Sequence, residues 1–193
     1  MIDYIKGAIT KITPACVVLE TSGVGYFINI SLTTFSELEK KTEVKILVHE
    51  VIREDAHQLF GFATDKEREI FRHLISVTGV GANTARMMLS SLSPAELELA
   101  IIGSDANILK SIKGIGLKTA QRIIVDLKEK LGKNSENSEI FTFSDNTNRE
   151  EALSALVMLG FAKSAVSKIL DKIVREEKNL TVETMIKRAL KDL

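Results

Sequence analysis

The sequence predicts an α+β chain of several small domains: a five-stranded β-barrel, a middle all-α domain and a C-terminal three-helix bundle. Three observations lead to this prediction. Residues 1–62 contain short runs rich in β-branched and aromatic residues, separated by turn signals. Residues 65–131 carry apolar residues at helical spacing around two Gly-apolar-Gly breaks. Residues 149–193 return to helical spacing after a polar stretch.

The first domain, residues 1–64, is expected to hold five strands. They are Tyr4-Ile5 with Ala8–Thr10, Cys16–Leu19, Tyr26–Ile30, Val44–Val48 and Gln58–Phe60. Five short strands fit a small closed barrel, and an OB-fold is the commonest such barrel that contacts nucleic acid, although an SH3-like barrel fits nearly as well. Residues 33–40 are predicted to form a short helix or loop, capped by Thr34 or Ser36.

The middle domain, residues 65–132, contains the same sequence motif twice. L-I-S-V-T-G-V-G-A-N-T-A-R and L-K-S-I-K-G-I-G-L-K-T-A-Q coincide when the chain is shifted so that Gly79 meets Gly114. Gly81 then meets Gly116, and a Thr-Ala pair follows each break. A self-match of this kind indicates an internal repeat of helix, sharp turn and helix.

Each break is suited to binding an anion. Two glycines allow a sharp turn and a close approach of the backbone to a ligand, while Val80 and Ile115 are expected to point inward as anchors. The helix that follows begins with unpaired N–H groups and the positive end of its dipole, where phosphate commonly binds. Ordinary helical corners punctuated by glycine would look similar, but two copies in one register favour a tandem helix-hairpin-helix that grips DNA backbone.

The candidate DNA-binding side chains lie at or just after the two breaks. Lys118 is interpreted as a point charge for phosphate and Arg122 as a forked partner. Asn83 aligns with Lys118, so the first copy is expected to rely more on backbone amides, with Arg86 as its nearest cation. The predicted contacts are Gly79, Val80, Gly81, Ala82, Asn83, Thr84, Arg86, Gly114, Ile115, Gly116, Lys118, Thr119 and Arg122.

Charge is distributed unevenly along the chain. The formal net charge is zero, which argues mildly against a nucleic-acid binder. By segment it is −2 over residues 1–64, +3 over 65–133 and −1 over 134–193, so the positive excess lies with the glycine breaks. The single cysteine excludes an internal disulfide framework, and no apolar run is long enough to span a membrane. The cytoplasm is the expected compartment.

Two adjacent carboxylates, Glu54 and Asp55, lie at a predicted hairpin tip between Val51 and His57. A solvated turn is the simpler interpretation, because Asp suits turns through local hydrogen bonds. The alternative is a deliberate negative point that repels DNA backbone and so steers the strands.

Residues 133–148 are rich in Asn, Ser and Glu and are predicted to form a flexible linker. Residues 149–193 are predicted to form three short helices with a small core, and they carry no basic excess, so they are interpreted as a protein-docking module. A purely structural tail is the alternative. The predicted partner-binding residues are Met158, Leu159 and Phe161.

Taken together, these features resemble one family over essentially the whole chain. The most specific pieces are V-I-R-E-D-A-H-Q-L-F-G-F and K-G-I-G-L-K-T-A-Q-R-I-I-V-D-L-K. With the barrel, the paired breaks, the polar linker and the helical tail, they resemble the RuvA family of bacterial Holliday-junction-binding proteins. One departure is Asn83, which stands where family members often have a lysine.

The resemblance implies a homotetramer in which each subunit takes one arm of a four-way DNA junction. A four-fold ring matches a four-armed substrate. It further implies that residues 80–82 and 115–117 hold phosphates and that Glu54 and Asp55 form an acidic pin at the crossover, where about eight carboxylates would gather in four copies. A UBA-like tail would dock the RuvB ATPase, and the RuvC nuclease would share the junction during recombination and DNA repair in the SOS response. The resemblance is compatible with one tetramer on the junction and with two face-to-face tetramers, which make an octamer.

Other classes of protein use the same DNA-gripping element, notably glycosylases and structure-specific nucleases. A glycosylase needs a pocket with aromatic residues for a flipped base, and the helical part has few. Carboxylates and histidines show no metal-ligand spacing, and no P-loop is present. A single-strand binder would need more exposed aromatics than Tyr26, Phe27 and Phe60. The sequence therefore predicts no catalytic residue, no metal and no cofactor, with a generic helix-hairpin-helix subunit of a repair nuclease or glycosylase system as the alternative.

Overall fold

The computed structural model describes residues 1–136, 144–177 and 180–193. The chain divides into two compact units, Met1–Asn137 and Ser138–Leu193. The first unit contains a β-barrel followed by five helices, and the second contains three helices. The α+β organisation predicted from the sequence is therefore confirmed.

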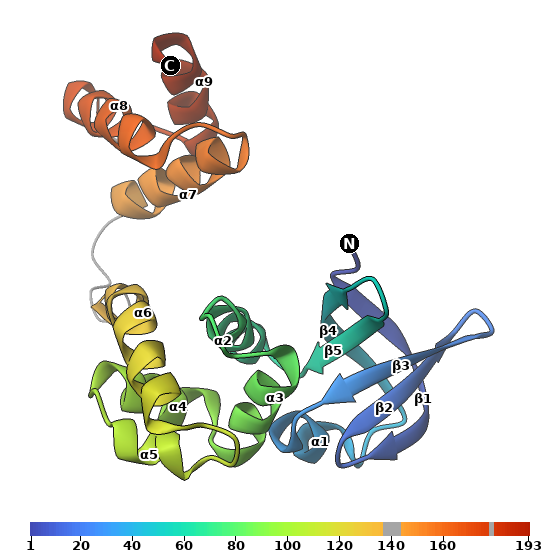
Figure 1. The fold of residues 1–193 in the computed structure, drawn as a ribbon. Coiled ribbons are helices and arrows are strands. Elements are labelled where there is room, and N and C mark those ends of the chain that lie inside the picture. The colour runs from blue at the N-terminus through green and yellow to red at the C-terminus, as the bar shows by residue number, and fades with distance from the viewer. Residues whose placement is uncertain (137–143, 178–179) are drawn as a thin grey trace. The chain divides into compact units, whose positions relative to one another are not determined.

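Five strands of the first unit wrap into a closed barrel (Figure 1). Their order around the barrel is β1-β2-β3-β5-β4, with β3 and β5 parallel and every other pair antiparallel. The strands are β1 (Tyr4–Thr13), β2 (Cys16–Thr21), β3 (Val24–Ile30), β4 (Glu43–Ile52) and β5 (His57–Phe62). Inward-facing aliphatic residues alternate with exposed ones, as in Ile28 and Ile30 on β3, and fill the barrel. Because each of the five strands is paired on both sides, the barrel leaves no open sheet edge.

Helix α1 (Leu32–Leu38) connects β3 to β4, and its start differs from the prediction. The cap is Ser31, whose hydroxyl accepts a hydrogen bond from the Thr34 N–H at 3.0 Å, rather than Thr34 or Ser36. The Thr34 hydroxyl instead donates to the buried Glu67 carboxylate at 2.7 Å, and the Ser36 hydroxyl donates back to the Leu32 carbonyl at 3.1 Å. The prediction was wrong because the helix begins at Leu32, so that Ser31, in an extended conformation just before it, is the residue whose hydroxyl can reach the Thr34 N–H.

Five helices complete the first unit: α2 (Asp65–Ile75), α3 (Ala82–Ser91), α4 (Pro94–Ile102), α5 (Ala106–Ser111) and α6 (Leu117–Glu136). Thr64 caps α2, and Ser93 forms a capping box with Glu96 at the start of α4. The helices share one apolar core with β5, in which the Phe71 ring lies 5.2 Å from that of Phe60. The barrel and the helices are therefore packed against each other.

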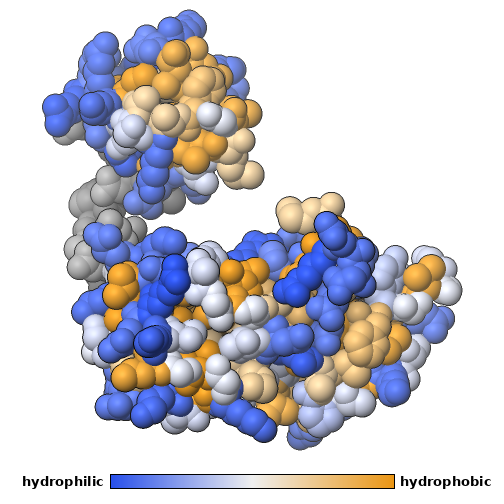
Figure 2. Space-filling model, in the orientation of Figure 1, coloured by the Kyte–Doolittle hydropathy of each residue, from blue (hydrophilic) through white to orange (hydrophobic). Residues whose placement is uncertain are grey.

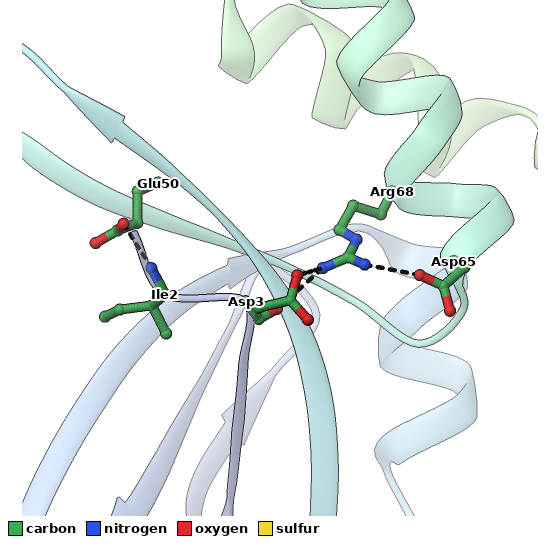
Figure 3. A network of polar contacts seen from close by, with 5 residues as sticks. All are labelled: Ile2, Asp3, Glu50, Asp65 and Arg68. Carbon is green, nitrogen blue, oxygen red and sulfur yellow. Dashed lines mark hydrogen bonds and ion pairs between the residues drawn. The ribbon is translucent and has the colours of Figure 1, made fainter. Parts of the chain in front are cut away.

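A polar network at the start of α2 reinforces this packing (Figure 3). Arg68 is nearly buried, and its Nη1 donates to the backbone carbonyl of Asp3 at 3.0 Å and to the Asp3 carboxylate at 2.6 Å. Its Nη2 donates to the Asp65 carboxylate at 2.7 Å. One planar guanidinium thus ties the N-terminal segment to α2, a geometry that lysine could not reproduce.

The second unit packs α7 (Ser144–Met158), α8 (Lys163–Glu176) and α9 (Val182–Asp192) around a small core that includes Leu156, Leu170 and Met185. Thr181 caps α9, and its hydroxyl accepts from the Thr184 N–H. Helix α6 continues to Glu136 and α7 begins at Ser144, so both ends of the predicted linker 133–148 are helical, and residues 137–143 lie outside the described part. Across the described residues, no helix is long and apolar enough to cross a bilayer.

Candidate nucleic-acid interface

The first glycine break joins α2 to α3. Gly79 has φ +96°, a left-handed conformation that side chains with a Cβ rarely adopt. Val80 is 5% exposed, packs into the helical core, and donates its N–H to the Val77 carbonyl at 3.0 Å. Gly81 caps α3 in an extended conformation, and its carbonyl accepts from the Ala85 N–H at 2.9 Å. The predicted inward anchor is confirmed.

The second break joins α5 to α6 and repeats this geometry. Gly114 has φ +92°, and Ile115 is 5% exposed in the same core. The Ile115 N–H donates to the Ile112 carbonyl at 3.0 Å, and the Ala120 N–H donates to the Gly116 carbonyl at 2.9 Å. The internal repeat seen in the sequence is thus a repeat of backbone conformation and hydrogen bonding.

Both breaks present an open helix start to solvent. A Cβ added at Gly81 or at Gly116 would meet no heavy atom of the described residues within 4 Å. Gly81 supplies no side-chain cap, and the first three N–H groups of a helix have no intrahelical partner. The glycines are therefore not required by packing within the chain. They leave room for an external acceptor to reach amides that also lie at the positive end of a helix dipole.

Side chains around the second break add positive charge. Lys118 is exposed in the first turn of α6, beside the half-buried Thr119. Arg122 follows one turn later, is 54% exposed and lies 3.8 Å from the Asp126 carboxylate. An exposed pair of this length contributes little and leaves the guanidinium able to take another acceptor.

Within residues 76–90, all of them described, Arg86 is the one cation near the first break in the sequence. Ala82 is buried, Asn83 is exposed and Thr84 is half-buried. Arg86 points away from the break to the barrel, where its Nη1 donates to the Ala15 carbonyl at 2.9 Å and to Asn29 Oδ1 at 3.2 Å. Sequence spacing could not reveal this contact, because the acceptor lies 71 residues earlier in the chain.

Glu54 and Asp55 lie in the four-residue connection between β4 and β5. The Arg53 N–H donates to the Ala56 carbonyl at 2.8 Å, which closes the hairpin. Residues 53–55 are exposed, and neither carboxylate has an ion pair or hydrogen bond to another side chain of the described chain. Two uncompensated negative charges therefore stand together at the tip.

The base of this hairpin is held by a contact that the sequence did not suggest. The Ile2 N–H donates to Glu50 Oε2 at 2.7 Å (Figure 3), and the His57 ring lies 3.2 Å from Glu50 Oε1. These contacts, led by the backbone N–H of Ile2, lower the pKa of Glu50. The N-terminus is therefore anchored beside the hairpin by a carboxylate 48 residues along the chain.

The predicted partner-binding residues lie at the turn between α7 and α8. Met158 and Leu159 are 85% and 64% exposed, whereas Phe161 is half-buried against the core of the second unit. Gly160 between them has φ +100°. Figure 2 shows a continuous apolar area on the drawn face of this unit. Within the described residues of the whole chain, no group of three or more His, Cys, Asp or Glu could hold a metal ion.

Comparison with known families assigns all three parts of the chain. Residues 1–61 match the RuvA N-terminal domain, and residues 147–193 match the RuvA C-terminal domain. Residues 71–129, which include both breaks, match a SAM-like helix-hairpin-helix tandem. These matches agree with the predicted OB-type barrel, tandem helix-hairpin-helix and C-terminal helical domain.

Whole-length relatives lead to the same family. The chain is 51% identical to a protein of Christiangramia forsetii and 49% identical to one of Flavobacterium psychrophilum, with all of both chains covered in each case. It is 48% identical to a protein of Bacteroides thetaiotaomicron, again over the full length of both. Each of these is named Holliday junction branch migration complex subunit RuvA. The chain belongs to the RuvA family.

Proposed function

We propose that this chain binds four-way DNA junctions structure-specifically as a homotetramer and holds them open and planar for branch migration. The observation that carries the proposal is the pair of open helix starts at Gly81 and Gly116, built with the same backbone geometry within one unit. Two such sites in one rigid frame would bind two phosphates at a set spacing. They contact backbone and not base edges, so the grip depends on DNA shape rather than sequence.

The two sites would bind by different means. The second combines backbone amides with Lys118 and Arg122, while the first relies on the amides of residues 82–84. Arg86 donates hydrogen bonds to Ala15 and Asn29, so its main role is to join α3 to the barrel. A net charge of +3 over residues 65–133 is modest, and four copies acting together would multiply it.

The uncompensated carboxylates of Glu54 and Asp55 would form the acidic pin at the crossover. Phosphate and carboxylate repel each other, so a negative tip keeps DNA backbone from closing over the centre and helps to separate strands. Exposure of both side chains and their lack of side-chain partners within the described chain support this role over that of an ordinary turn.

The second unit would dock the RuvB ATPase through Met158, Leu159 and Phe161, and RuvC would share the junction. Exposed apolar residues at a turn are typical of a docking site. The chain itself would be a non-catalytic DNA-binding subunit without a cofactor, because ATP hydrolysis would belong to its partner. An assembly that acts on chromosomal DNA in recombination and repair belongs in the bacterial cytoplasm.

A gel-shift competition at about 0.1–0.2 M salt, where screening suppresses weak contacts, tests the proposal. The competitors are a synthetic four-way junction and linear duplex with the same arm sequence, each with a scrambled-sequence control. A strong preference for the junction that does not depend on sequence is expected. Equal affinity for both would contradict the proposal and would favour a generic helix-hairpin-helix subunit of a nuclease or glycosylase system.

A further inference from the structure

The base of the β4–β5 hairpin carries an exposed apolar side chain whose role the acidic pin does not explain. Ile52 is the last residue of β4 and is 70% exposed. It is the one large hydrophobic residue of β4 and β5, both fully described, that is exposed. This side chain is mostly exposed within its own unit and lies close in the chain to two carboxylates, so it is available to a partner outside the chain.

The side chain of Ile52 is directed by the hairpin register. Ile52 pairs with His57 across β4 and β5. Because Arg53 and Ala56 form the hydrogen bond that closes the loop, the Ile52–His57 pair is of the non-hydrogen-bonded kind, in which the two side chains lie closest and on the same face. The His57 side chain is itself 58% exposed. Together they form a small exposed platform, half apolar and half imidazole.

This platform is held in a defined orientation. The Glu50 carboxylate, two residues before Ile52 on the same face of β4, contacts the His57 ring at 3.2 Å and accepts from the Ile2 N–H at 2.7 Å. The Glu50 side chain is only 11% exposed, so it holds the His57 ring from one side of the platform and leaves most of the ring accessible. The exposed surface of Ile52 is thus presented by a fixed hairpin.

We propose that Ile52, with His57 beside it, is the surface on which an unpaired base rests when the junction is held open. This inference rests on the proposed function. Glu54 and Asp55 exclude phosphate from the tip, so the part of DNA that can approach the base of the pin is its uncharged part, the base. Apolar side chains that wedge against a base step, and flat rings that stack on bases, are common means of stabilising unstacked DNA.

The test uses the full-length protein and a fixed four-way junction with 2-aminopurine one base pair from the crossover, whose fluorescence rises when the base unstacks. At saturating protein, Ile52→Thr keeps the β-branched shape that suits a strand but removes apolar surface. It should lower the opening equilibrium about fivefold, as expected for the loss of one weak base contact. Ile52→Val, which keeps the β-branched shape and most of the apolar surface, should retain the signal. Val24→Thr, at the start of β3 beside another hairpin turn, is the matched control and should leave it unchanged.

Each outcome bears on the inference separately from the proposed function. An Ile52→Thr signal equal to that of the unaltered protein, or no fluorescence rise with the unaltered protein bound, would overturn the inference while leaving junction binding intact. If Ile52→Thr changed the assembly state in light scattering, Ile52 would belong to a contact between copies of the chain, and the inference would also fail. Loss of junction preference by the unaltered protein in the gel shift would instead overturn the proposed function itself.

Discussion

Arg86 in α3 donates from Nη1 to the backbone carbonyl of Ala15 in the turn between β1 and β2, at 2.9 Å. The same Nη1 lies 3.2 Å from Asn29 Oδ1 on β3. The cation nearest to the first glycine break in the sequence is therefore used to hold the barrel against the helix that follows the break. Its place in the sequence predicted a contact with phosphate. In the fold, its hydrogen-bond acceptors are Ala15 and Asn29 of the barrel.

This contact leads to a paired prediction for Arg86 and Lys118. Arg86→Ala should lower the free energy of unfolding of the first unit by about 1–2 kcal/mol, because hydrogen bonds from a charged donor are lost. It should leave the salt dependence of duplex binding unchanged. Lys118→Ala should do the reverse and reduce the slope of log affinity against log salt by about 1, the effect of one phosphate contact. Equal reductions of the slope would show that Arg86 contacts DNA after all.

The glycines of each break should separate into two classes. Gly81→Val and Gly116→Val should weaken junction and duplex binding about tenfold or more, because a side chain would block phosphate from the helix amides. Thermal unfolding should be nearly unchanged, since a Cβ there meets nothing within 4 Å. Gly114→Val should instead lower the free energy of unfolding by about 1–3 kcal/mol, because Gly114 has φ +92°. Unaltered DNA affinity of Gly116→Val would remove the basis for the anion site.

Neutralising the pin should separate binding from opening. The double variant Glu54→Gln, Asp55→Asn should bind the junction as tightly as the unaltered protein or more tightly, because repulsion of phosphate is relieved. Strand separation at the crossover, followed by the reactivity of unpaired thymines, should change. The double variant Glu37→Gln, Glu39→Gln, in and just after α1, removes the same charge from another exposed site. Loss of junction binding by the pin variant alone would mean that the carboxylates help to hold DNA.

The docking role of the second unit predicts a clean division of activities. A chain lacking residues 149–193 should keep its DNA affinity and lose the ability to stimulate the motor ATPase. Met158→Ser with Leu159→Ser should reproduce that loss without unfolding the unit, because both side chains are largely exposed. Phe161→Ala should also lower the stability of the unit, since its ring packs against the core. A truncated chain that failed to bind DNA would contradict the assignment of these residues to a separate docking unit.

Glu67 gives the first unit a predictable dependence on pH. Burial raises the pKa of Glu67 above its ordinary value of 4.5, against hydrogen bonds from Ser31, Thr34 and the Ala63 N–H that lower it. The folded state thus holds this proton more tightly than the unfolded state, so this contribution to stability is fully present below pH 4.5 and is lost as pH rises through the folded pKa.

Glu67→Gln removes that contribution and isolates it. The free energy of unfolding of the unaltered protein minus that of Glu67→Gln should be greatest below pH 4.5 and should shrink toward neutral pH. Glu50 and Glu96 have lowered pKa values and the opposite slope, but they are present in both proteins and cancel in the difference. Denaturant titrations of both proteins at several pH values measure this difference in the free energy of unfolding. A difference that grows toward neutral pH would contradict the raised pKa of Glu67.

The sequence by itself determined the features that depend on local chemistry. Period-2 and period-3.6 patterns separate the barrel from the helices, and the caps at Thr64, Ser93 and Thr181 follow from hydroxyl residues placed before apolar runs. The two glycine breaks could be recognised in the sequence because a turn of this kind needs a residue without a Cβ at one fixed position. The inward anchors Val80 and Ile115 follow from the same local geometry.

Tertiary structure alone decided which polar residues meet across the chain. The hydroxyls of Ser31 and Thr34 both donate to the carboxylate of Glu67, which lies more than 30 residues further along the chain. Arg86 turns from the break to Ala15, and Glu50 anchors Ile2 beside the hairpin, although no spacing in the sequence relates these pairs. The physical reason is that a long polar side chain can satisfy its hydrogen bonds with any acceptor within reach, and only the folded backbone decides which acceptor that is.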